Sequence, residues 1–287
     1  MAAALPEIEA SRRRPWPLQL KAGLFIVVTI LVLAALAPWI APHPWDTISI
    51  RTRFLPPNAT YWLGTDDFGR DVLSRLLMGA RLSVAMGLGA TLFSVAIGVP
   101  IGLAAGYFRG WVDEVLMRTA DVLMAIPAIM LGLLVLAVTP PALWKTMLAV
   151  GFVYIPLIAR VARSVTLGLA SEDFVQAARA RAESTGYILF REILPNMRSY
   201  IAISFTIGMT GAIYAQIALY FLGLAPLAGD NWGIMLNLAW YRGAIFFKNS
   251  FWYIMAPILI ISLLQLAMVT MTRSLEDIFN PRLRAGQ

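Results

Sequence analysis

The sequence predicts an all-α, polytopic integral membrane protein with six transmembrane helices, from its composition, its apolar runs and its distribution of charge. Hydrophobic residues make up 59% of the 287 residues and charged residues only 14%, whereas soluble domains carry about 25% charged residues. Several apolar runs reach the roughly 20 residues that a helix needs to cross a bilayer. The chain is therefore expected to form one integral membrane domain, with its polar residues gathered between the spans.

Cysteine and histidine, which build many metal and catalytic sites, are almost absent from the chain. There is no cysteine, which excludes disulfides, thiolate metal sites and thiol catalysis. The single histidine, His43, lies between two prolines and is expected to be a loop residue rather than a ligand. The net charge of +7 does not indicate nucleic-acid binding, because membrane proteins concentrate Lys and Arg in their cytoplasmic loops.

The amino-terminal part is interpreted as a cytoplasmic tail, residues 1–21, followed by a first span over residues 22–41. A basic start before an apolar run also fits a signal peptide, and Ala35-Leu36-Ala37 resembles a cleavage box. Pro38 directly after that tripeptide and the length of the run argue against cleavage. Residues 22–287 are therefore expected to form a single transmembrane domain that retains its first span.

Residues 42–80 are expected to form a periplasmic loop. Prolines are frequent in its first half, and residues of both charges gather in its second half, just ahead of the second span. Taken alone, this pattern favours a solvated, salt-bridged loop that is held at the face of the membrane.

The second span is expected over residues 82–107 and carries Gly98, Gly102 and Gly106 at four-residue spacing. Small residues on one face let helices approach closely in lipid. These glycines therefore predict a packing seam, either within the subunit or with a partner. Residues 109–118 are expected to form a short cytoplasmic turn after this span.

The core spans together are expected to occupy residues 82–272. The third span is expected over residues 119–138, with a kink at the proline in its middle, Pro127. Asp121 lies near the start of this span, one turn after Arg118. We expect these two side chains to form a local ion pair at the membrane surface.

Three further spans follow, over residues 145–165, 199–222 and 251–272. Pro156 is expected to kink the first of these spans, and Pro257 to interrupt the last. Two consecutive prolines, Pro140 and Pro141, mark a short outer turn before these three spans. An aromatic-rich stretch between the last two spans is expected to be re-entrant or interfacial, because Trp and Tyr gather at the level of the headgroups.

The distribution of basic residues predicts the orientation of the six spans. With the amino terminus inside, 15 of the 23 Lys and Arg residues fall in the inner segments. Basic residues favour the cytoplasmic side, so both termini and the stretch at residues 171–196 are expected in the cytoplasm. The inner basic residues are Arg12, Arg13, Arg14, Lys21, Arg109, Arg118, Arg160, Arg163, Arg179, Arg181, Arg191, Arg198, Arg273, Arg282 and Arg284.

The longest polar interval of the second half begins at Ser171 and is expected to form two short helices. Ser171 can cap the first helix, and Ala177 and Ala178 lie on its small apolar face. Gly186 fits a left-handed turn after that helix. Pro195 is expected to end the second helix, because the residue before a proline avoids the helical region. Two such helices are suited to dock a partner protein at the membrane surface.

The same interval carries a recognisable motif. Gln176-Ala177-Ala178, Gly186 and Ile193-Leu194-Pro195-Asn196 resemble the EAA loop of bacterial ABC importer permeases, in which Glu-Ala-Ala, Gly and Leu-Pro follow at fixed spacing. Gln176 stands where the family usually has Glu, which places the salt bridge of that acid in doubt. The resemblance implies a cytoplasmic coupling segment that docks on an ATPase. The residues implied in this contact are Gln176, Ala177, Ala178, Gly186, Arg191, Leu194, Pro195 and Asn196.

A second motif lies just before the second span, between Leu63 and Ser83. It resembles the corresponding segment of the dipeptide, oligopeptide and nickel branch of importer permeases, specifically the second of the two paired permeases. Trp232-Gly233 also matches the family, whereas Ala225 replaces a usual glycine, and Ala215-Gln216 stands where relatives tend to carry an acid. The matching residues of the second motif are Gly64, Thr65, Asp66, Gly69, Arg70, Asp71, Ser74, Arg75, Gly79 and Arg81.

The resemblance implies the type I permease fold of ABC importers and a transport subunit with no catalytic, metal or cofactor site of its own. The implied partners are a homologous second permease in a heterodimer, two ABC ATPase subunits that use ATP and Mg, and a periplasmic or lipid-anchored solute-binding protein. The implied location is the bacterial inner membrane, with no nucleic-acid partner. The chain has no G-x-x-x-x-G-K-[ST] phosphate loop, which agrees with ATP hydrolysis in separate subunits.

The branch that the chain resembles handles dipeptides, oligopeptides, nickel complexes and some sugars or opines, and the sequence does not distinguish among them. Under this interpretation, Ala178→Glu and Gly186→Val are predicted to abolish ATP-driven uptake and to leave the abundance of the protein nearly intact. The isolated chain is predicted neither to bind nor to hydrolyse ATP.

Two other functions are compatible with a protein of many spans: a self-contained secondary transporter or channel, and an intramembrane enzyme. A transporter that couples to ions normally has ionisable residues deep inside its spans. The centres of these apolar runs carry almost none, and their main polar residues are the uncharged Gln216 and Gln265. An enzyme needs a nucleophile with its base, or a metal set, and the composition of the chain does not supply one. ATP turnover by the isolated chain would favour a self-contained machine.

Overall fold

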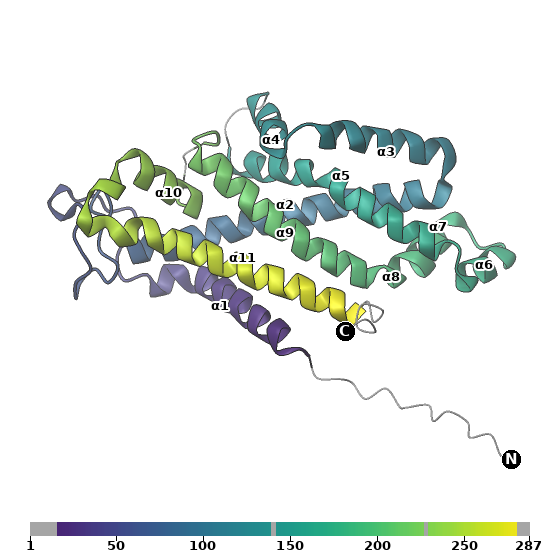
Figure 1. The fold of residues 1–287 in the computed structure, drawn as a ribbon, viewed down its shortest axis with the longest axis horizontal. Helices are drawn as coiled ribbons and strands as arrows, with labels where there is room; N and C mark the ends of the chain where they lie inside the picture. The colour runs from purple at the N-terminus through teal and green to yellow at the C-terminus, as the bar shows by residue number, and fades with distance from the viewer. Residues whose placement is uncertain (1–15, 139–141, 227–228, 280–287) are drawn as a thin grey trace, which may run out of the picture.

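The computed structural model describes residues 16–138, 142–226 and 229–279, which form an elongated bundle of helices (Figure 1). No strand forms among these residues, and their only extended pairing is an isolated bridge between Thr65 and Asp71. Three sequence predictions lie outside the described residues: most of the amino-terminal tail, the turn at Pro140-Pro141 and the basic carboxyl-terminal tail.

Five helices are each long and apolar enough to cross a membrane, and a sixth span forms if the bent pair α3 and α4 is counted as one. The predicted all-α fold with six spans is therefore confirmed in its main features. The spans are α1 (Leu18–Ile40), α2 (Val72–Phe108), α3 (Gly110–Ala125) with α4 (Ala128–Ala137), α5 (Leu143–Leu169), α9 (Arg198–Phe221) and α11 (Phe251–Phe279).

Helix α2 begins ten residues earlier than predicted, so the end of the expected periplasmic loop is helical. Asp71 caps this helix, because its Oδ2 accepts hydrogen bonds from the backbone N of Ser74 at 3.0 Å and from the Ser74 hydroxyl at 2.6 Å. The charged residues of this stretch suggested a solvated loop. They instead lie just ahead of this helix and on its first turns, and all except Arg81 are buried or half-buried.

The cytoplasmic turn predicted at residues 109–118 is also wrong, because α3 already begins at Gly110. Arg109 and Gly110 both adopt left-handed backbone conformations, with φ of +55° and +54°. These two residues complete the reversal between α2 and α3. The kink predicted at Pro127 is confirmed, since α3 and α4 meet there at 95°. Pro156 and Pro257 lie inside α5 and α11, which continue through them.

Two ion pairs fasten α3 to α5. Asp113 of α3 binds Arg163 of α5 through both carboxylate oxygens. Asp121 pairs with Arg160 of α5, and not with Arg118 as predicted. The sequence favoured a partner one turn away because local pairs are the only ones that spacing can reveal, whereas helix packing brings Arg160 alongside.

The glycine seam of α2 packs within the subunit, against α5. A Cβ at Gly98 would lie 2.8 Å from the Cβ of Ile158, and a Cβ at Gly106 would lie 2.8 Å from the carbonyl oxygen of Arg163. Gly102 likewise faces the backbone of Ala159. The absence of side chains at these three positions therefore lets α2 and α5 approach closely.

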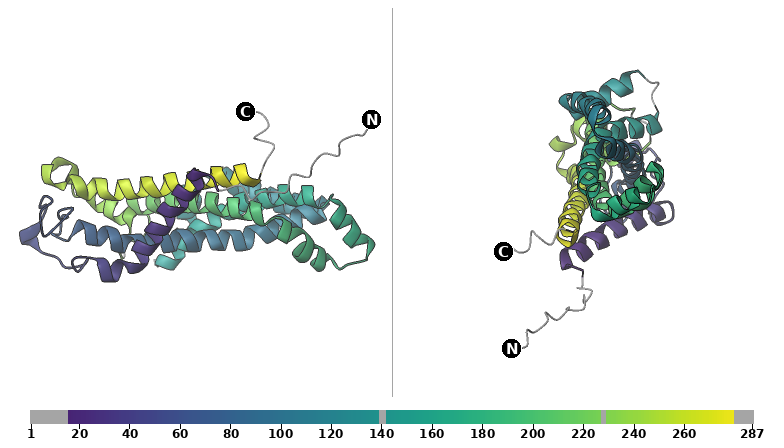
Figure 2. Two further views of the ribbon diagram at one scale, coloured as in Figure 1. Left: turned by 90° about the horizontal axis from the view of Figure 1, so that it is seen from below. Right: turned by 90° about the vertical axis from the view of Figure 1, so that its right-hand side faces the viewer.

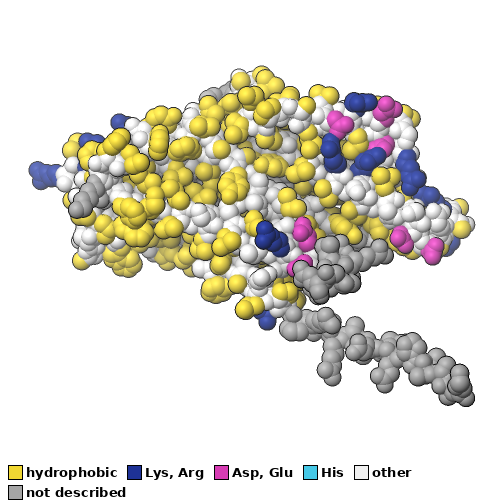
Figure 3. All heavy atoms as spheres, in the orientation of Figure 1, with side chains coloured by type: hydrophobic (Ala, Val, Ile, Leu, Met, Phe, Trp, Pro, Cys, Tyr) yellow, Lys and Arg dark blue, Asp and Glu magenta, His cyan; other side chains and the backbone are white. Residues whose placement is uncertain are grey.

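The two ends of the bundle carry different structures (Figures 1 and 2). One end holds the loop at residues 42–71 and the short helix α10 (Trp232–Tyr241), which is the predicted interfacial segment, and 3₁₀ turns at Ile50–Thr52, Ala244–Phe246 and Lys248–Ser250. The other end holds α6 (Asp173–Ala180), α7 (Thr185–Tyr187), a π-helical turn at Ile188–Ile193 and α8 (Leu194–Asn196). On the face shown in Figure 3, apolar side chains cover the middle, and charged side chains gather toward the end with α6 to α8.

Candidate functional site

The segment α6 to α8 is anchored on its own chain by buried apolar side chains. Val175 and Ala178 of α6 are completely buried, as is Ile193 of the π-helical turn. They pack in one cluster with Leu103 of α2 and Ile158 of α5. This end of the bundle is therefore continuous with the membrane helices, and a force applied to the segment would be transmitted to α2 and α5.

The exposed face of the segment differs from the face that the sequence suggested. Ala178 is completely buried within the subunit and is therefore not available for a contact with a partner. Gln176, Ala177 and Gly186 are exposed. Most of the other residues of the motif are exposed or half-buried there, namely Arg191, Leu194, Pro195 and Asn196.

Two aromatic side chains of the same segment, which sequence reasoning missed, are also exposed. Phe190 is 59% exposed and Tyr187 is 39% exposed. Large apolar side chains at the tip of a protruding segment are typical of a protein contact. Their position between the Gly and Leu-Pro elements of the motif was the signal that could have identified them.

Local geometry corrects three predictions for this segment. Ser171 donates its hydroxyl to the Gly168 carbonyl at 2.7 Å and does not cap α6. Gly186 lies inside α7 with no left-handed φ, whereas Ala182 adopts φ of +55° after α6. Pro195 does not end the helix, because the wider π-helical turn before it accommodates a residue without an N–H.

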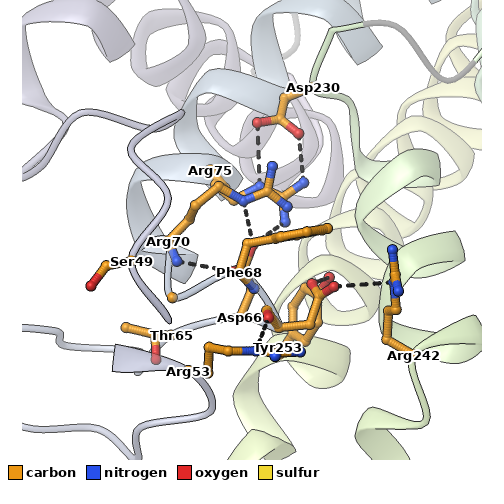
Figure 4. A network of polar contacts seen from close by, with 12 residues as sticks. Ser49, Arg53, Thr65, Asp66, Phe68, Arg70, Arg75, Asp230, Arg242 and Tyr253 are labelled. Carbon is orange, nitrogen blue, oxygen red and sulfur yellow. Dashed lines mark hydrogen bonds and ion pairs between the residues drawn. The ribbon is translucent and has the colours of Figure 1, made fainter. Parts of the chain in front are cut away.

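At the opposite end, the second motif forms a buried network of charges (Figure 4). Arg75 is completely buried, and its Nη1 lies 2.6 Å from Asp66 Oδ2. Its Nη2 lies 2.6 Å from Asp230 Oδ1, and its Nε lies 3.3 Å from Asp230 Oδ2. Arg70 adds a further ion pair to Asp66 at 2.7 Å. The sequence predicted that these charged residues are exposed to solvent, and that prediction is wrong. The predicted salt bridges are present.

Asp67 lies beside this network but has different partners. It accepts a hydrogen bond from the Tyr253 hydroxyl at 3.0 Å, and Arg242 Nε lies 3.4 Å from its Oδ2. Burial away from water raises the pKa of the Asp67 carboxyl, and the neighbouring carboxylate of Asp66 raises it further. The network thus joins the loop at residues 42–71 to α2, α10 and α11.

The other residues of this motif have separate places. Gly64 and Gly69 have φ of +74° and +76°, which form the tight turns of the loop. Gly79 packs closely on Trp232, because a Cβ there would lie 3.3 Å from the indole ring. Thr65 accepts a hydrogen bond from the backbone N of Leu55 at 2.8 Å. Arg81 is exposed on α2 and does not join the network.

His43 occupies a loop position beside Asp71, as predicted for a loop residue. Its backbone N donates to the Ser74 hydroxyl at 3.0 Å, and its Nδ1 lies 3.6 Å from Asp71 Oδ2. Among the described residues, no group of three or more His, Cys, Asp and Glu side chains is placed to hold a metal ion.

Sequence reasoning missed Asp230, Arg242 and Tyr253, because each lies at least 155 residues along the chain from the motif residue that it contacts. Asp230 offered one signal. It is the only acid between Glu192 and Glu276, so an isolated charge in an otherwise apolar half of the chain had to find a partner elsewhere.

Comparison with known proteins agrees with this geometry. Residues 98–285 match the family described as binding-protein-dependent transport system inner membrane component. Residues 21–57 match the N-terminal TM domain of oligopeptide transport permease C. The second match covers α1 and the start of the loop at residues 42–71, and the first covers the helices from the later part of α2 onward.

Curated relatives match almost the whole chain. A dipeptide transport system permease protein DppC of Alkalihalophilus pseudofirmus is 33% identical over 264 residues, which cover 92% of this chain and 86% of the relative. A glutathione transport system permease protein GsiD of Pectobacterium atrosepticum is 36% identical, with 83% of each chain covered. An oligopeptide transport system permease protein OppC of Bacillus subtilis is 33% identical, with 80% and 77% covered.

The fold matches solved structures as well. A chain of the MetNI methionine ABC transporter, in an inward-facing conformation, superimposes with a TM-score of 0.56 at 18% identity, and the match covers 70% of this chain and 96% of that one. At this identity the likeness shows the fold, which is the type I permease fold of ABC importers. Together with the family match over residues 98–285 and the identities above, it establishes that this chain belongs to the binding-protein-dependent transport system inner membrane components, as a membrane-spanning transport subunit rather than an enzyme.

Proposed function

We propose that this chain forms half of the translocation pathway of an ATP-driven importer for peptides or similar small solutes. A homologous second permease supplies the other half, in a heterodimer. Two ATPase subunits bind ATP and Mg, and no cofactor binds to this chain. A binding protein, periplasmic or lipid-anchored, delivers the solute at the end with the loop at residues 42–71, and both termini lie in the cytoplasm.

The observation that carries this proposal is the exposed face of the segment α6 to α8. It presents a small residue, Ala177, and two exposed aromatic side chains, Tyr187 and Phe190. Beneath that face, Val175 and Ile193 are packed into the membrane bundle. A nucleotide-dependent movement of an ATPase groove around the face would therefore move α2 and α5.

The choice of peptides as the solute class rests on the relatives. The relatives named above are permeases of dipeptide, glutathione and oligopeptide transport systems, and all three names indicate peptide-like solutes. The solute itself is expected to be selected mainly by the binding protein.

The docking face can be tested by co-purification of the ATPases with variants of the chain. Phe190→Ala is expected to reduce the retained ATPase and the ATP-driven uptake about tenfold or more, since exposed aromatic side chains often dominate an interface. Lys21→Ala on the exposed side of α1 is the matched control and is expected to retain both. If Phe190→Ala retains the ATPase and full uptake, this face is not the docking surface.

A second experiment tests the solute. Vesicles that contain the assembled complex are given dipeptides, longer peptides or a nickel complex, each with the binding protein and with ATP inside or absent. Peptide uptake that requires ATP supports the proposal. Uptake without ATP would favour a self-contained transporter, and uptake of the nickel complex alone would exclude peptides as the solute.

A further inference from the structure

One face of α2 remains uncovered over several turns. Arg81, Ala85, Leu88 and Leu92 follow one another at spacings of four, three and four residues, so they lie on one side of the helix. All four are exposed, Leu88 by 36% and Leu92 by 53%. The face is thus apolar along its length, with a single cation at the end nearest the loop at residues 42–71.

A hollow of about 400 Å³ lies at that end. It combines apolar walls with an acid and a base, since its lining residues are Trp45, Met78, Arg81, Leu82, Ala85 and Asp230. Asp230 is already bound by the buried Arg75 through both of its oxygens. Within the described part of the chain, Arg81 has no acidic partner, so the hollow offers one uncompensated positive charge.

The length of α2 indicates at which level of the bilayer this hollow lies. Its 37 residues extend about 55 Å at 1.5 Å per residue, whereas the hydrocarbon core of a bilayer is about 30 Å thick. Both ends of α2 must therefore leave the hydrocarbon, by about 12 Å each if the excess is shared. Arg81 lies nine residues after Val72, or about 14 Å from the helix start. Arg81 therefore lies within about 2 Å of the edge of the hydrocarbon core. From there its long side chain reaches the headgroups, the level at which Trp side chains are also enriched.

We propose that this hollow binds the phosphate group of a membrane phospholipid. Arg81 donates hydrogen bonds to the phosphate oxygens, which suits the planar guanidinium. An acyl chain of the same lipid lies along Ala85, Leu88 and Leu92. The lipid belongs to the leaflet on the side of the loop at residues 42–71, and it contacts the Arg75–Asp230 pair from outside.

Two features favour a lipid over a free anion. The apolar strip continues directly from the cation, so a ligand with a phosphate and a hydrocarbon chain covers both, whereas a free phosphate covers only the first. Asp230 is neutralised by Arg75, so it does not repel a phosphate at Arg81 as an unpaired carboxylate would. The proposal is independent of the solute that the protein transports.

The experiment uses the purified full chain, stripped of lipid in detergent and titrated with dioleoyl-phosphatidylglycerol, with bound lipids counted by native mass spectrometry. The wild type is expected to retain one lipid most tightly. Arg81→Gln is expected to weaken that site about tenfold, the effect of losing one charge-assisted hydrogen bond. Arg51→Gln, which removes an exposed cation in the outer loop, is the matched control and is expected to bind like the wild type.

Three further measurements separate the possible ligands. Ala85→Trp fills the hollow and keeps Arg81, and it is expected to weaken lipid binding as well. Dioleoylglycerol, which lacks the phosphate, and glycerol 1-phosphate, which lacks the acyl chains, are both expected to compete poorly. Equal affinity of the wild type and Arg81→Gln, or equal loss in Arg51→Gln, would overturn the proposal. Competition by glycerol 1-phosphate as effective as that by the lipid would reduce the hollow to a site for free anions and would also overturn it.

Discussion

At the scale of single residues, the unusual feature is a guanidinium with no exposure to water. Arg75 is held between Asp66 and Asp230, which come from the loop at residues 42–71 and from the turn before α10. A buried charge is costly unless it is paired and its hydrogen bonds are made. Arg75 therefore fixes the position of two segments that are far apart in the sequence, and each of the three residues depends on the other two.

Asp230→Ala is predicted to destabilise the protein by about 3 to 5 kcal/mol, because it leaves a buried guanidinium with a single acid. The measurement is thermal unfolding of the purified protein in detergent. Asp46→Ala, which removes an exposed acid from the same end of the molecule, is the control and is expected to stay within about 0.5 kcal/mol of the wild type. An unfolding temperature for Asp230→Ala equal to that of the control would show that the pair contributes no stability.

The buried carboxyl of Asp67 predicts a dependence of stability on pH. Its pKa is raised in the folded protein above the ordinary value of 3.8, so the folded state binds the proton more tightly than the unfolded state. The contribution of this group to stability is complete below pH 3.8 and is lost as the pH rises through the folded pKa.

Asp67→Asn removes that titration, and it keeps an oxygen that can accept from the Tyr253 hydroxyl. Its stability relative to the wild type is therefore expected to improve between pH 4 and pH 8, as the wild-type carboxyl ionises. Unfolding temperatures of both proteins across this range provide the measurement. A difference between the two proteins that stays constant with pH would contradict the raised pKa. The ion pair with the half-exposed Arg242 is expected to contribute little.

At the scale of elements, the segment α6 to α8 has two faces with different roles. The inner face holds Val175, Ala178 and Ile193 against the membrane helices. The outer face carries Ala177, Gly186 and Phe190. A substitution on the inner face therefore acts through folding, and one on the outer face acts through the proposed contact with the ATPase.

Ala178→Glu and Ala177→Glu separate these roles. Glu at position 178 would place a charge in a fully buried apolar cluster and is expected to lower the abundance of the protein several-fold. This replaces the prediction, made from the sequence, that abundance stays intact. Ala177→Glu is expected to leave abundance unchanged and to reduce coupling. Immunoblots of membranes, together with ATPase co-purification, measure both. Equal abundance of the two variants would contradict the inward orientation of Ala178.

Gly186 also differs in conformation from the left-handed turn that the sequence predicted. Nothing in the subunit lies within 4 Å of a Cβ built at this position, and its φ is not positive. Gly186→Val is therefore expected to fold normally, and its effect on uptake depends only on how closely the ATPase approaches. Gly186→Ala is the graded control.

At the scale of the whole molecule, the bundle separates two chemically distinct ends (Figures 1 and 2). The buried charge network lies at one end, and the segment α6 to α8 lies at the other. The longest helix, α2, connects them and is packed along α5 through the glycine seam. This arrangement gives a rigid connection between the proposed delivery of solute outside and the proposed docking of the ATPase inside.

The orientation of this bundle can be measured directly, because the chain has no cysteine. Single cysteines at Thr60 and Thr185, both exposed, are treated with a membrane-impermeant maleimide in intact spheroplasts. Only the cysteine at position 60 is expected to react, and the one at position 185 is expected to react after the membrane is opened. Reaction of both in intact spheroplasts would refute the proposed orientation.

Much of this protein was determined by the sequence itself. Apolar runs of sufficient length must become helices in lipid, where the backbone has to satisfy its own hydrogen bonds, so the number and order of the spans followed. The glycine spacing of α2 predicted close packing, and Pro127 predicted the break between α3 and α4. Two short motifs singled out the segment α6 to α8 and the charged segment before α2, which lie at opposite ends of the bundle (Figure 1).

Only the tertiary structure decided which faces of these elements are buried and which distant charges meet. Ala177 and Ala178 are chemically identical, and only the packing of α6 against α2 and α5 decides that Ala178 is buried and Ala177 exposed. From the sequence alone, Asp66 and Arg75 resemble solvated loop residues. They are buried because folding brings Asp230, 155 residues away from Arg75, into contact with Arg75, and a charge is stable in the interior only with such a partner. Sequence spacing reveals contacts within one or two turns of a helix, whereas the contacts that organise both ends of this protein are made between elements.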